Sequence, residues 1–248
     1  MSTFKDHFSG HSTNYQKFRP DYPIELFEFL SSQCEEHKYA WDAGTGNGQC
    51  AVHLADFFEK ILATDPSANQ IAEAIQNENI AYDVSKAEDC PGGDDLFDLI
   101  TVAQAFHWFD FQAFFAELER VIKPNGIFAV WTYTHAKVTT DIDEVYLKFY
   151  NDVVGMYWPP ERRFVEEKYE SIKFPMTEIE APEFEIELEY SMTDYMSYLG
   201  TWSAVKNFKK EQGTNPLNVI EKELTTAWGN PDLVRKVVWP LHLRLFRN

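Results

Sequence analysis

The sequence has 248 residues, of which 44% are hydrophobic and 16% aromatic, so it can bury one large core and fits a single α/β domain. Its formal net charge of -18 argues against nucleic acids and anionic membranes as partners, because neutralising phosphates needs clustered Lys and Arg. No stretch reaches the roughly 18 uncharged apolar residues of a membrane span, and the start lacks an apolar signal core. The three cysteines include no Cys-x-x-Cys pair, which favours free thiols in a cytoplasmic protein, and we expect no metal site.

The first segment with a clear pattern is Tyr15-x-x-x-Arg19-Pro20-x-Tyr22-Pro23, followed by an amphipathic helical pattern over 24–30. Proline suits the start of such a helix. Two interpretations of Tyr15 and Arg19 stay open at this point. They are either surface residues of a lead-in or residues that cover a ligand, where a guanidinium can pair with both oxygens of a carboxylate.

A glycine-rich loop follows the apolar run 39–42. It contains Asp42, Ala43 and then glycine at three alternate positions, Gly44, Gly46 and Gly48, before a helical pattern over 49–56. Glycine lets the backbone turn sharply and lets a ligand approach closely, and the helix N-terminus favours an anionic or polar ligand. The spacing is not that of a dinucleotide fingerprint, whose third glycine comes one position later, and the Lys-Ser/Thr pair of a P-loop is absent.

The second apolar run, 60–64, ends in Asp65 and Pro66. Ligands of doubly wound sheets bind outside the carboxyl ends of the strands, so a carboxylate at this position can accept both hydroxyls of a ribose. The alternative is that Asp65 caps the helix that follows. The two roles can coexist, and we favour ribose binding.

This combination of motifs resembles the class I S-adenosylmethionine (SAM)-dependent methyltransferases. The resemblance implies that the glycine loop and Asp65 hold SAM and that the product is S-adenosylhomocysteine. The Tyr-x-x-x-Arg-Pro-x-Tyr-Pro segment is similar to the N-terminal lid of small-molecule methyltransferases related to trans-aconitate methyltransferases. It implies that Tyr15 and Arg19 cover SAM and hold its carboxylate. A short match over 200–204 points to the same group.

The third expected strand ends in a turn over 83–91. In the family, the corresponding turn holds adenine through a backbone amide, which here belongs to Ala87. The acidic residue that often precedes it is replaced by Lys86, and an ammonium has no acceptor to offer the adenine amine. Ser85 or a carbonyl could serve instead. Glu88 is a further candidate contact, or only a solvated charge.

The fourth expected strand, 97–102, leads into Ala-Gln-Ala-Phe-His-Trp-Phe over 103–109. This tract resembles the family's segment beside the sulfonium and the acceptor, which implies that Gln104, Ala105 and Trp108 contact the cofactor. His107 is the candidate general base because an imidazole titrates near neutral pH. The alternative is hydrophobic packing under a helix over 111–121 that begins at Asp110, and we prefer packing for the phenylalanines.

The alternation of strands and helices predicts a doubly wound α/β fold, a Rossmann-like sheet of seven strands whose last strand is antiparallel, with helical lid insertions. The expected strands are 39–42, 60–65, 80–84, 97–102 and 126–132, then 183–190 with four glutamates on one face, and 241–246 at the chain end. Helices are expected at 49–56, 68–75, 111–121, 141–153, 161–171 and within 193–229. We expect one domain over 1–248, with a core of 35–135 and 180–248, an N-terminal lid of 1–30, and insertions of 136–175 and 193–230.

The sequence therefore predicts a cytoplasmic, SAM-dependent methyltransferase, monomer or homodimer, that acts on a small-molecule acceptor. A carboxylate is one candidate acceptor, for which the cations Arg162, Arg163, Lys168 and Lys206 are available. Two other functions stay open. A nicotinamide-dependent oxidoreductase would share the glycine loop and Asp65, and a SAM-binding regulator without catalysis would share the whole binding loop.

Overall fold

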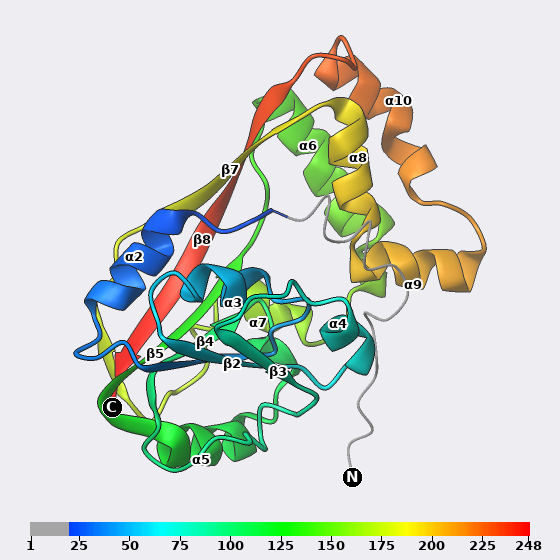
Figure 1. Ribbon diagram of the computed structural model, residues 1–248. Coiled ribbons are helices and arrows are strands. Elements are labelled where there is room, and N and C mark those ends of the chain that lie inside the picture. The colour runs from blue at the N-terminus through cyan, green and yellow to red at the C-terminus, as the bar shows by residue number, and fades with distance from the viewer. Residues whose placement is uncertain (1–19) are drawn as a thin grey trace.

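The computed structural model describes residues 20–248, and its centre is a mixed sheet (Figure 1). Five strands run parallel: β1 (Tyr39–Ala43), β2 (Lys60–Thr64), β3 (Ile80–Asp83), β4 (Phe97–Ala103) and β5 (Ile122–Tyr133). Three strands are antiparallel to their neighbours: β6 (Thr177–Ile179), β7 (Phe184–Tyr190) and β8 (Arg235–Arg247). The order is β3-β2-β1-β4-β5-β8-β6, and β7 pairs with β8. The predicted fold class and the antiparallel last strand are confirmed.

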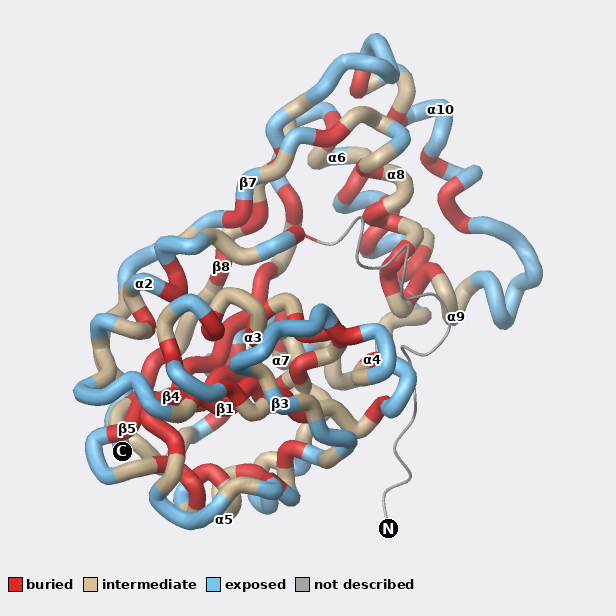
Figure 2. Tube along the Cα trace, viewed as in Figure 1, coloured by how far each residue is buried: buried red, intermediate tan, exposed pale blue. Residues whose placement is uncertain are grey.

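The central strands bury both faces because their alternate side chains enter two different cores. In β5, Ile127, Ala129 and Trp131 belong to one core, whereas Phe128 and Val130 belong to the other, and all five are buried. The apolar side chains of β1 and β4 are also divided between the two cores. Period-two alternation with apolar residues on both sides is what a parallel sheet covered by two layers requires. Figure 2 shows the buried positions concentrated along these strands.

Helices form the two covering layers. On one face lie α2 (Ile24–Ser32) and α3 (Gln49–Leu54), and on the other lie α5 (Phe111–Val121) and α7 (Arg162–Glu166). The short α4 (Ala68–Ala72) follows β2. Because Leu26, Phe27 and Leu30 are fully buried, α2 is part of the core. Residues 24–30, the last part of the predicted lid of 1–30, therefore pack against the sheet.

The insertions form a further helical layer beside β7 and the first half of β8 (Figure 1). It contains α6 (Thr140–Lys148), the π-helix η2 (Phe149–Val153), the short η3 (Gly155–Tyr157), α8 (Met192–Gly200), α9 (Ser203–Gln212) and α10 (Leu217–Trp228). The helix predicted over 161–171 is shorter, because Lys168 and Tyr169 have positive φ and end it. Large aromatic side chains, including Tyr146, Tyr195 and Trp228, are fully buried in this layer.

The antiparallel part of the sheet is more extensive than expected. β8 begins at Arg235, so its first half pairs with β7 from Tyr190 opposite Arg235 to Phe184 opposite Leu241. Its second half, which contains the predicted strand 241–246, lies between β5 and the unpredicted β6. In β7 the glutamates at 185, 187 and 189 are exposed, as the alternation predicted.

A turn was predicted at Lys123-Pro124-Asn125-Gly126, leading into the expected strand 126–132. Asn125 has φ 63°, a backbone region that Asn tolerates better than most residues, and the pairing register of β4 with β5 shifts here. Gly126 has no room for a side chain, because a Cβ would lie 2.6 Å from Cγ1 of Ile122. The turn is therefore present, as an irregularity within β5.

Candidate cofactor and acceptor site

The glycine loop connects β1 to α3 and is held against the end of β2. The amides of Gly44 and Thr45 both donate to the carbonyl of Thr64, at 2.8 and 2.9 Å. Gly44, Gly46 and Gly48 all have positive φ, which favours glycine at each position. Their surroundings differ: a Cβ on Gly44 would lie 2.6 Å from Cβ of Ala105, whereas a Cβ on Gly46 would meet no atom of residues 20–248 within 4 Å. The loop therefore leaves open space in front of Gly46, where a ligand can approach the backbone.

Asp42 lies beneath the loop and is fully buried at the end of β1. Its two carboxylate oxygens accept hydrogen bonds from the hydroxyls of Thr45, at 2.5 Å, and Thr101, at 2.9 Å. Burial raises the pKa of Asp42, and the hydroxyl donors partly oppose this shift. Asp42 thus fixes the loop from below and ties β1 to β4. Ala43, the next residue, is also fully buried.

Asp65 follows β2, as predicted, and binds the glycine loop directly. One oxygen accepts from the amide of Gly46 at 3.0 Å, and the other accepts from the amide of Ser67 at 2.8 Å. The N-cap of α4 is Ser67, whose hydroxyl accepts from Gln70, so Asp65 supports the cap without being the cap itself. Asp65 and its neighbour Pro66 are both partly exposed at the edge where the loop lies.

The predicted adenine turn follows β3. Ala87 is buried, and the hydroxyl of Ser85 donates to the carbonyls of Lys86 and Asp89, so this hydroxyl serves the turn itself. Glu88 is more than a solvated charge, because its carboxylate accepts from the amide of Asp110 at 2.7 Å. It thereby links this turn to the start of α5.

Gln104 directly follows β4 and has a conformation that is unusual for a residue other than glycine, with φ 55°. Three contacts hold it. Its backbone amide donates to the carbonyl of Trp131, its side-chain carbonyl accepts from Thr132 at 2.5 Å, and its side-chain amide donates to the carbonyl of Tyr133 at 3.3 Å. The side chain is therefore fixed at the sheet edge.

The aromatic tract after Gln104 forms the short helix η1 (Phe106–Trp108). Phe106 is fully buried among the rings of α5, as expected for packing, and Asp110 is the N-cap of α5. His107 Nδ1 lies 3.0 Å from the hydroxyl of Tyr169. Burial, and then the charge of Arg162, lower the pKa of His107 to about 3. His107 is therefore neutral at physiological pH.

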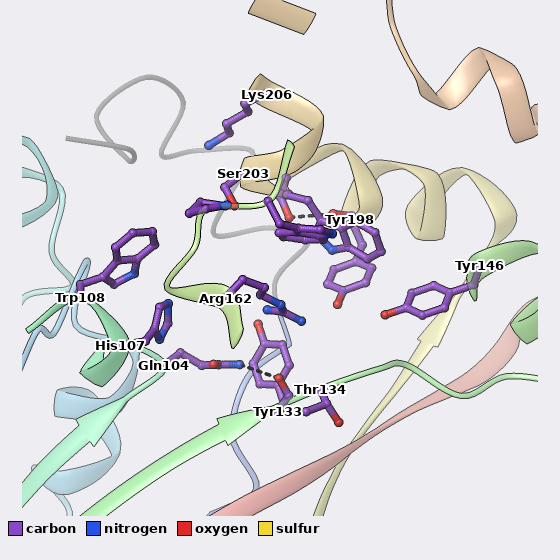
Figure 3. A pocket seen from close by; sticks show the side chains of 14 residues that line it. Gln104, His107, Trp108, Tyr133, Thr134, Tyr146, Arg162, Tyr198, Ser203 and Lys206 are labelled. Carbon is purple, nitrogen blue, oxygen red and sulfur yellow. Dashed lines mark hydrogen bonds between the residues drawn. The ribbon is translucent and has the colours of Figure 1, made fainter. Parts of the chain in front are cut away.

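A pocket opens at the carboxyl ends of β4 and β5 and is closed from the other side by the helical insertions. Its lining, drawn in Figure 3, consists of Gln104, His107, Trp108, Tyr133, Thr134, Tyr146, Trp158, Pro159, Arg162, Tyr198, Thr201, Trp202, Ser203 and Lys206. Three predicted site residues, Gln104, His107 and Trp108, thus line one cavity together with residues of the insertions. The glycine loop adjoins them through the contact between Gly44 and Ala105.

Arg162 is central in the view of the pocket, above the pair formed by Gln104 and Tyr133 (Figure 3). Its Nε donates to the hydroxyl of Tyr150 at 2.9 Å, and its guanidinium lies 4.8 Å from the ring centroid of Trp158. Among residues 20–248, no carboxylate forms an ion pair with it. Of the four candidate cations, Arg162 and Lys206 line the pocket, whereas Arg163 stacks on Phe164 instead.

Sequence reasoning named the cations Arg162 and Lys206 and the segment 200–204, but it missed other residues on the acceptor side of this pocket, such as Tyr146. Tyr146 and Tyr198 are buried in α6 and α8 and face the strand ends only because the insertions fold back over them. His135, two residues after β5, was also missed, although it follows a strand at the binding edge. Its Nδ1 lies 3.0 Å from the hydroxyl of Tyr146. The position of His135 just after an apolar strand was a signal that could have found it.

Comparisons with known proteins agree with this geometry. A model of the family described as a methyltransferase domain matches residues 41–130, which include the glycine loop, Asp65 and the tract after β4. A Dictyostelium discoideum protein that carries the name of a methyltransferase is 35% identical over 241 residues, which are 95% of this chain and 91% of that protein. The chain belongs to the class I SAM-dependent methyltransferases.

Two further similarities extend this assignment. A solved structure from Anaeromyxobacter dehalogenans, named as a type II methyltransferase, has a TM-score of 0.87 and 40% identity, covering 93% of this chain and 98% of that one. A Saccharomyces cerevisiae protein named as a SAM-dependent methyltransferase is 28% identical, over 59% of this chain and 55% of its own length. The cofactor of this methyltransferase is SAM, and the oxidoreductase alternative is set aside.

The glycine loop fits this cofactor, because the open space at Gly46 is a cradle that any side chain would fill. Tyr15 and Arg19, the predicted lid residues, lie outside the described residues. Within residues 20–248, no helix is long and apolar enough to cross a membrane, and no group of His, Cys, Asp and Glu side chains could hold a metal ion. The cysteines Cys34, Cys50 and Cys90 are free thiols.

Proposed function

We propose that this methyltransferase acts on a small-molecule acceptor that binds in the pocket around Arg162, next to SAM on the glycine loop. The observation that carries the proposal is the junction of the two sites. Gln104, at the end of β4, lines the pocket, and the adjoining Ala105 packs against Gly44 of the loop. A cofactor on the loop and an acceptor in the pocket would therefore meet at this point.

The residues proposed to hold SAM surround the loop. The loop would receive SAM in the open space at Gly46, with Gly48 completing the turn, and Asp65 offers a carboxylate to the ribose. Ala87 offers an amide to adenine. Asp42, Ala43, Gly44 and Pro66 shape the site, and Ser85, Glu88, Gln104, Ala105 and Trp108 complete the proposed contacts, with Tyr15 and Arg19 as the proposed cover. The three contacts of Gln104 support its role in positioning.

When bound, SAM supplies an electrophilic methyl group on a sulfonium, and a lone pair of the acceptor forms the new bond while the electrons of the broken carbon–sulfur bond stay on sulfur. The chain supplies alignment and exclusion of water, which the aromatic lining of the pocket favours. His107 was the candidate base. A pKa near 3 makes it a weak proton acceptor at neutral pH, so an acceptor that arrives already ionised suits this site better.

The position of Arg162 in the pocket supports an acceptor that carries a carboxylate group. Its guanidinium is held by Tyr150 and Trp158 but has no ion-pair partner among residues 20–248, so it can offer its planar fork to two oxygens. A nucleic-acid acceptor is disfavoured by the net charge of -18. The acceptor pocket is formed by insertions into the same sheet, which supports one domain over the whole chain.

The function can be tested in two steps. Calorimetry should show binding of S-adenosylhomocysteine with about micromolar affinity, of the order of -8 kcal/mol, and no binding of NADH. Incubation with radiolabelled SAM and a pool of small acids should then give a labelled small product. Binding of S-adenosylhomocysteine without transfer to any small molecule, but with transfer to protein or nucleic acid, would contradict the proposed acceptor class.

A further inference from the structure

The acceptor pocket has an unusual combination of aromatic rings and positive charge. Around it stand the rings of Trp108, Trp158, Trp202, Tyr133, Tyr146 and Tyr198. Wide flat rings of this kind favour two classes of ligand, organic cations and other flat aromatic molecules. The charge of the side chains that line the pocket determines which of these two classes of ligand is favoured.

Arg162 occupies the place that an organic cation would take. Its guanidinium lies over two rings, 4.8 Å from the centroid of Trp158 and 5.6 Å from that of Tyr150. Lys206, on α9, adds a second positive charge to the lining (Figure 3). Burial is the main cause of the lowered pKa of His107 and of His135, and the charge of Arg162 lowers both pKa values further, although Glu166 opposes this at His135. A cationic ligand would meet repulsion here, whereas an anion would be attracted.

The guanidinium is oriented by a short chain of contacts. The hydroxyl of Tyr150 accepts from Nε of Arg162 at 2.9 Å and donates to the carboxylate of Glu166 at 2.5 Å. Tyr150 is buried in the π-helix η2, and single-turn π-helices are frequent at functional sites. Because Nε is engaged and the plane rests on Trp158, the remaining N–H groups are held in a fixed direction.

We infer that the methyl acceptor is a flat aromatic acid whose ring packs against the partly exposed Trp108 and Trp158 while its carboxylate pairs with Arg162. Tyr150 and Glu166 are positioning residues for this pair. The inference rests on the proposed function and narrows its acceptor from small acids in general to aromatic acids. It excludes aliphatic amines and quaternary ammonium compounds as preferred acceptors.

Four probes of similar size separate the contributions of ring and charge. Cinnamate has both, 3-cyclohexylpropanoate has only the charge, cinnamamide has only the ring, and cinnamylamine reverses the charge. Calorimetry with the protein saturated with S-adenosylhomocysteine should give the tightest binding for cinnamate. We expect cinnamamide to bind roughly 10- to 100-fold more weakly and the cyclohexyl acid roughly 2- to 10-fold more weakly. Cinnamylamine should not bind.

Variants then locate the charge. Arg162→Gln should weaken cinnamate to the level of cinnamamide and leave cinnamamide unchanged. Tyr150→Phe, which keeps the ring but removes the hydroxyl, should weaken cinnamate less, and it provides a second test if Arg162→Gln does not fold. Arg163→Gln is the matched control, because Arg163 is adjacent in sequence but stacks on Phe164 and does not line the pocket. It should bind all probes like the parent.

Three outcomes would overturn the inference: equal affinity for all four probes, a preference for cinnamylamine, or no binding of any probe to protein that binds S-adenosylhomocysteine. An Arg162→Gln variant that keeps its preference for cinnamate over cinnamamide would also overturn it. Failure of the parent protein to bind S-adenosylhomocysteine is a different result, since it would contradict the proposed function itself.

Discussion

Gly46 is the residue at which ligand binding and folding can be separated most cleanly. An added Cβ would meet no atom within 4 Å in the described part of the chain, so Gly46→Ala should fold and lose only the ~1–3 kcal/mol that a left-handed backbone costs a residue other than glycine. The same Cβ would enter the space proposed for SAM. We therefore expect Gly46→Ala to lose most of its affinity for S-adenosylhomocysteine in calorimetry.

Gly213 supplies the control for this change. It has a similar backbone, with φ 70° against 58° for Gly46, and a Cβ there would also meet none of the described atoms within 4 Å, but Gly213 ends α9. Gly213→Ala should lose a similar free energy of unfolding and bind S-adenosylhomocysteine normally. Equal affinity in the two variants would show that the space at Gly46 is not used by the cofactor.

Asp65 has two roles that one substitution can distinguish. Asp65→Ala removes the acceptor for the amides of Gly46 and Ser67, so the melting temperature should fall. If the carboxylate also accepts from the ribose, SAM affinity should fall by roughly 1–3 kcal/mol, the usual cost of removing a charged acceptor. Calorimetry and thermal unfolding on the same sample measure both. A lower melting temperature with unchanged affinity would leave Asp65 a structural role only.

His107 gives a prediction about pH. Its pKa falls from 6.5 to about 3 on folding, through burial and then Arg162, so between these values the unfolded chain binds a proton that the folded chain does not. The free energy of unfolding should therefore decrease as the pH drops below 6.5. We expect His107→Gln to lose less stability than the parent between pH 6.5 and about pH 4.5, in urea titrations at each pH. Parallel pH dependence of the two proteins would contradict the lowered pKa.

The glycine loop could be predicted from sequence, because its conformation depends on residues that are adjacent in the chain. The acceptor pocket could be predicted only in part, because several of its residues were named from the sequence but their convergence was not. Arg162 and Trp202 meet there only because α7 and α9 fold back over the ends of β4 and β5, and nothing local in their sequence marks them as neighbours. The same limit applies to the pKa of His107, which was expected near neutral. The sequence does not show that this imidazole is buried and lies near Arg162.

Asp98 connects three secondary-structure elements and should be essential to their alignment. One oxygen accepts from the amides of Lys38 and Tyr39 before and within β1, both at 2.9 Å, and the other pairs with Lys123 in β5 at 2.5 Å. Asp98 itself lies in β4 and is buried. Asp98→Ala leaves the amides of Lys38 and Tyr39 without this acceptor, whereas Lys123 keeps its ion pair with Glu36. We therefore expect a loss of about 1–3 kcal/mol in urea unfolding. Lys38→Ala, which keeps its backbone amide, is the control and should cost little.

Strands could be predicted from the sequence where their alternation of apolar and polar residues is visible locally. The central parallel strands were found because they are apolar on both faces. β7 was found because exposed glutamates alternate with its apolar residues. β6 was missed because it has only three residues, and β8 was placed too late because the polar residues Arg235 and Lys236 at its start carry no apolar alternation. β6 and the start of β8 are held by pairing with strands that are distant in the sequence.

At the scale of the whole molecule, the net charge of -18 means that the folded chain repels itself. Salt screens exposed charges, with a Debye length of about 10 Å at 0.1 M, so raising NaCl from 0.01 to 0.15 M should increase stability. A gain of about 1 kcal/mol would raise the melting temperature by roughly 2–4 °C.

KCl should give the same gain, since the effect depends on ionic strength and not on the cation. The double variant Glu183→Gln/Glu185→Gln removes two exposed charges at β7 and should respond less to salt. A melting temperature that falls with salt would instead show that local ion pairs, such as Lys123 with Asp98, outweigh the repulsion.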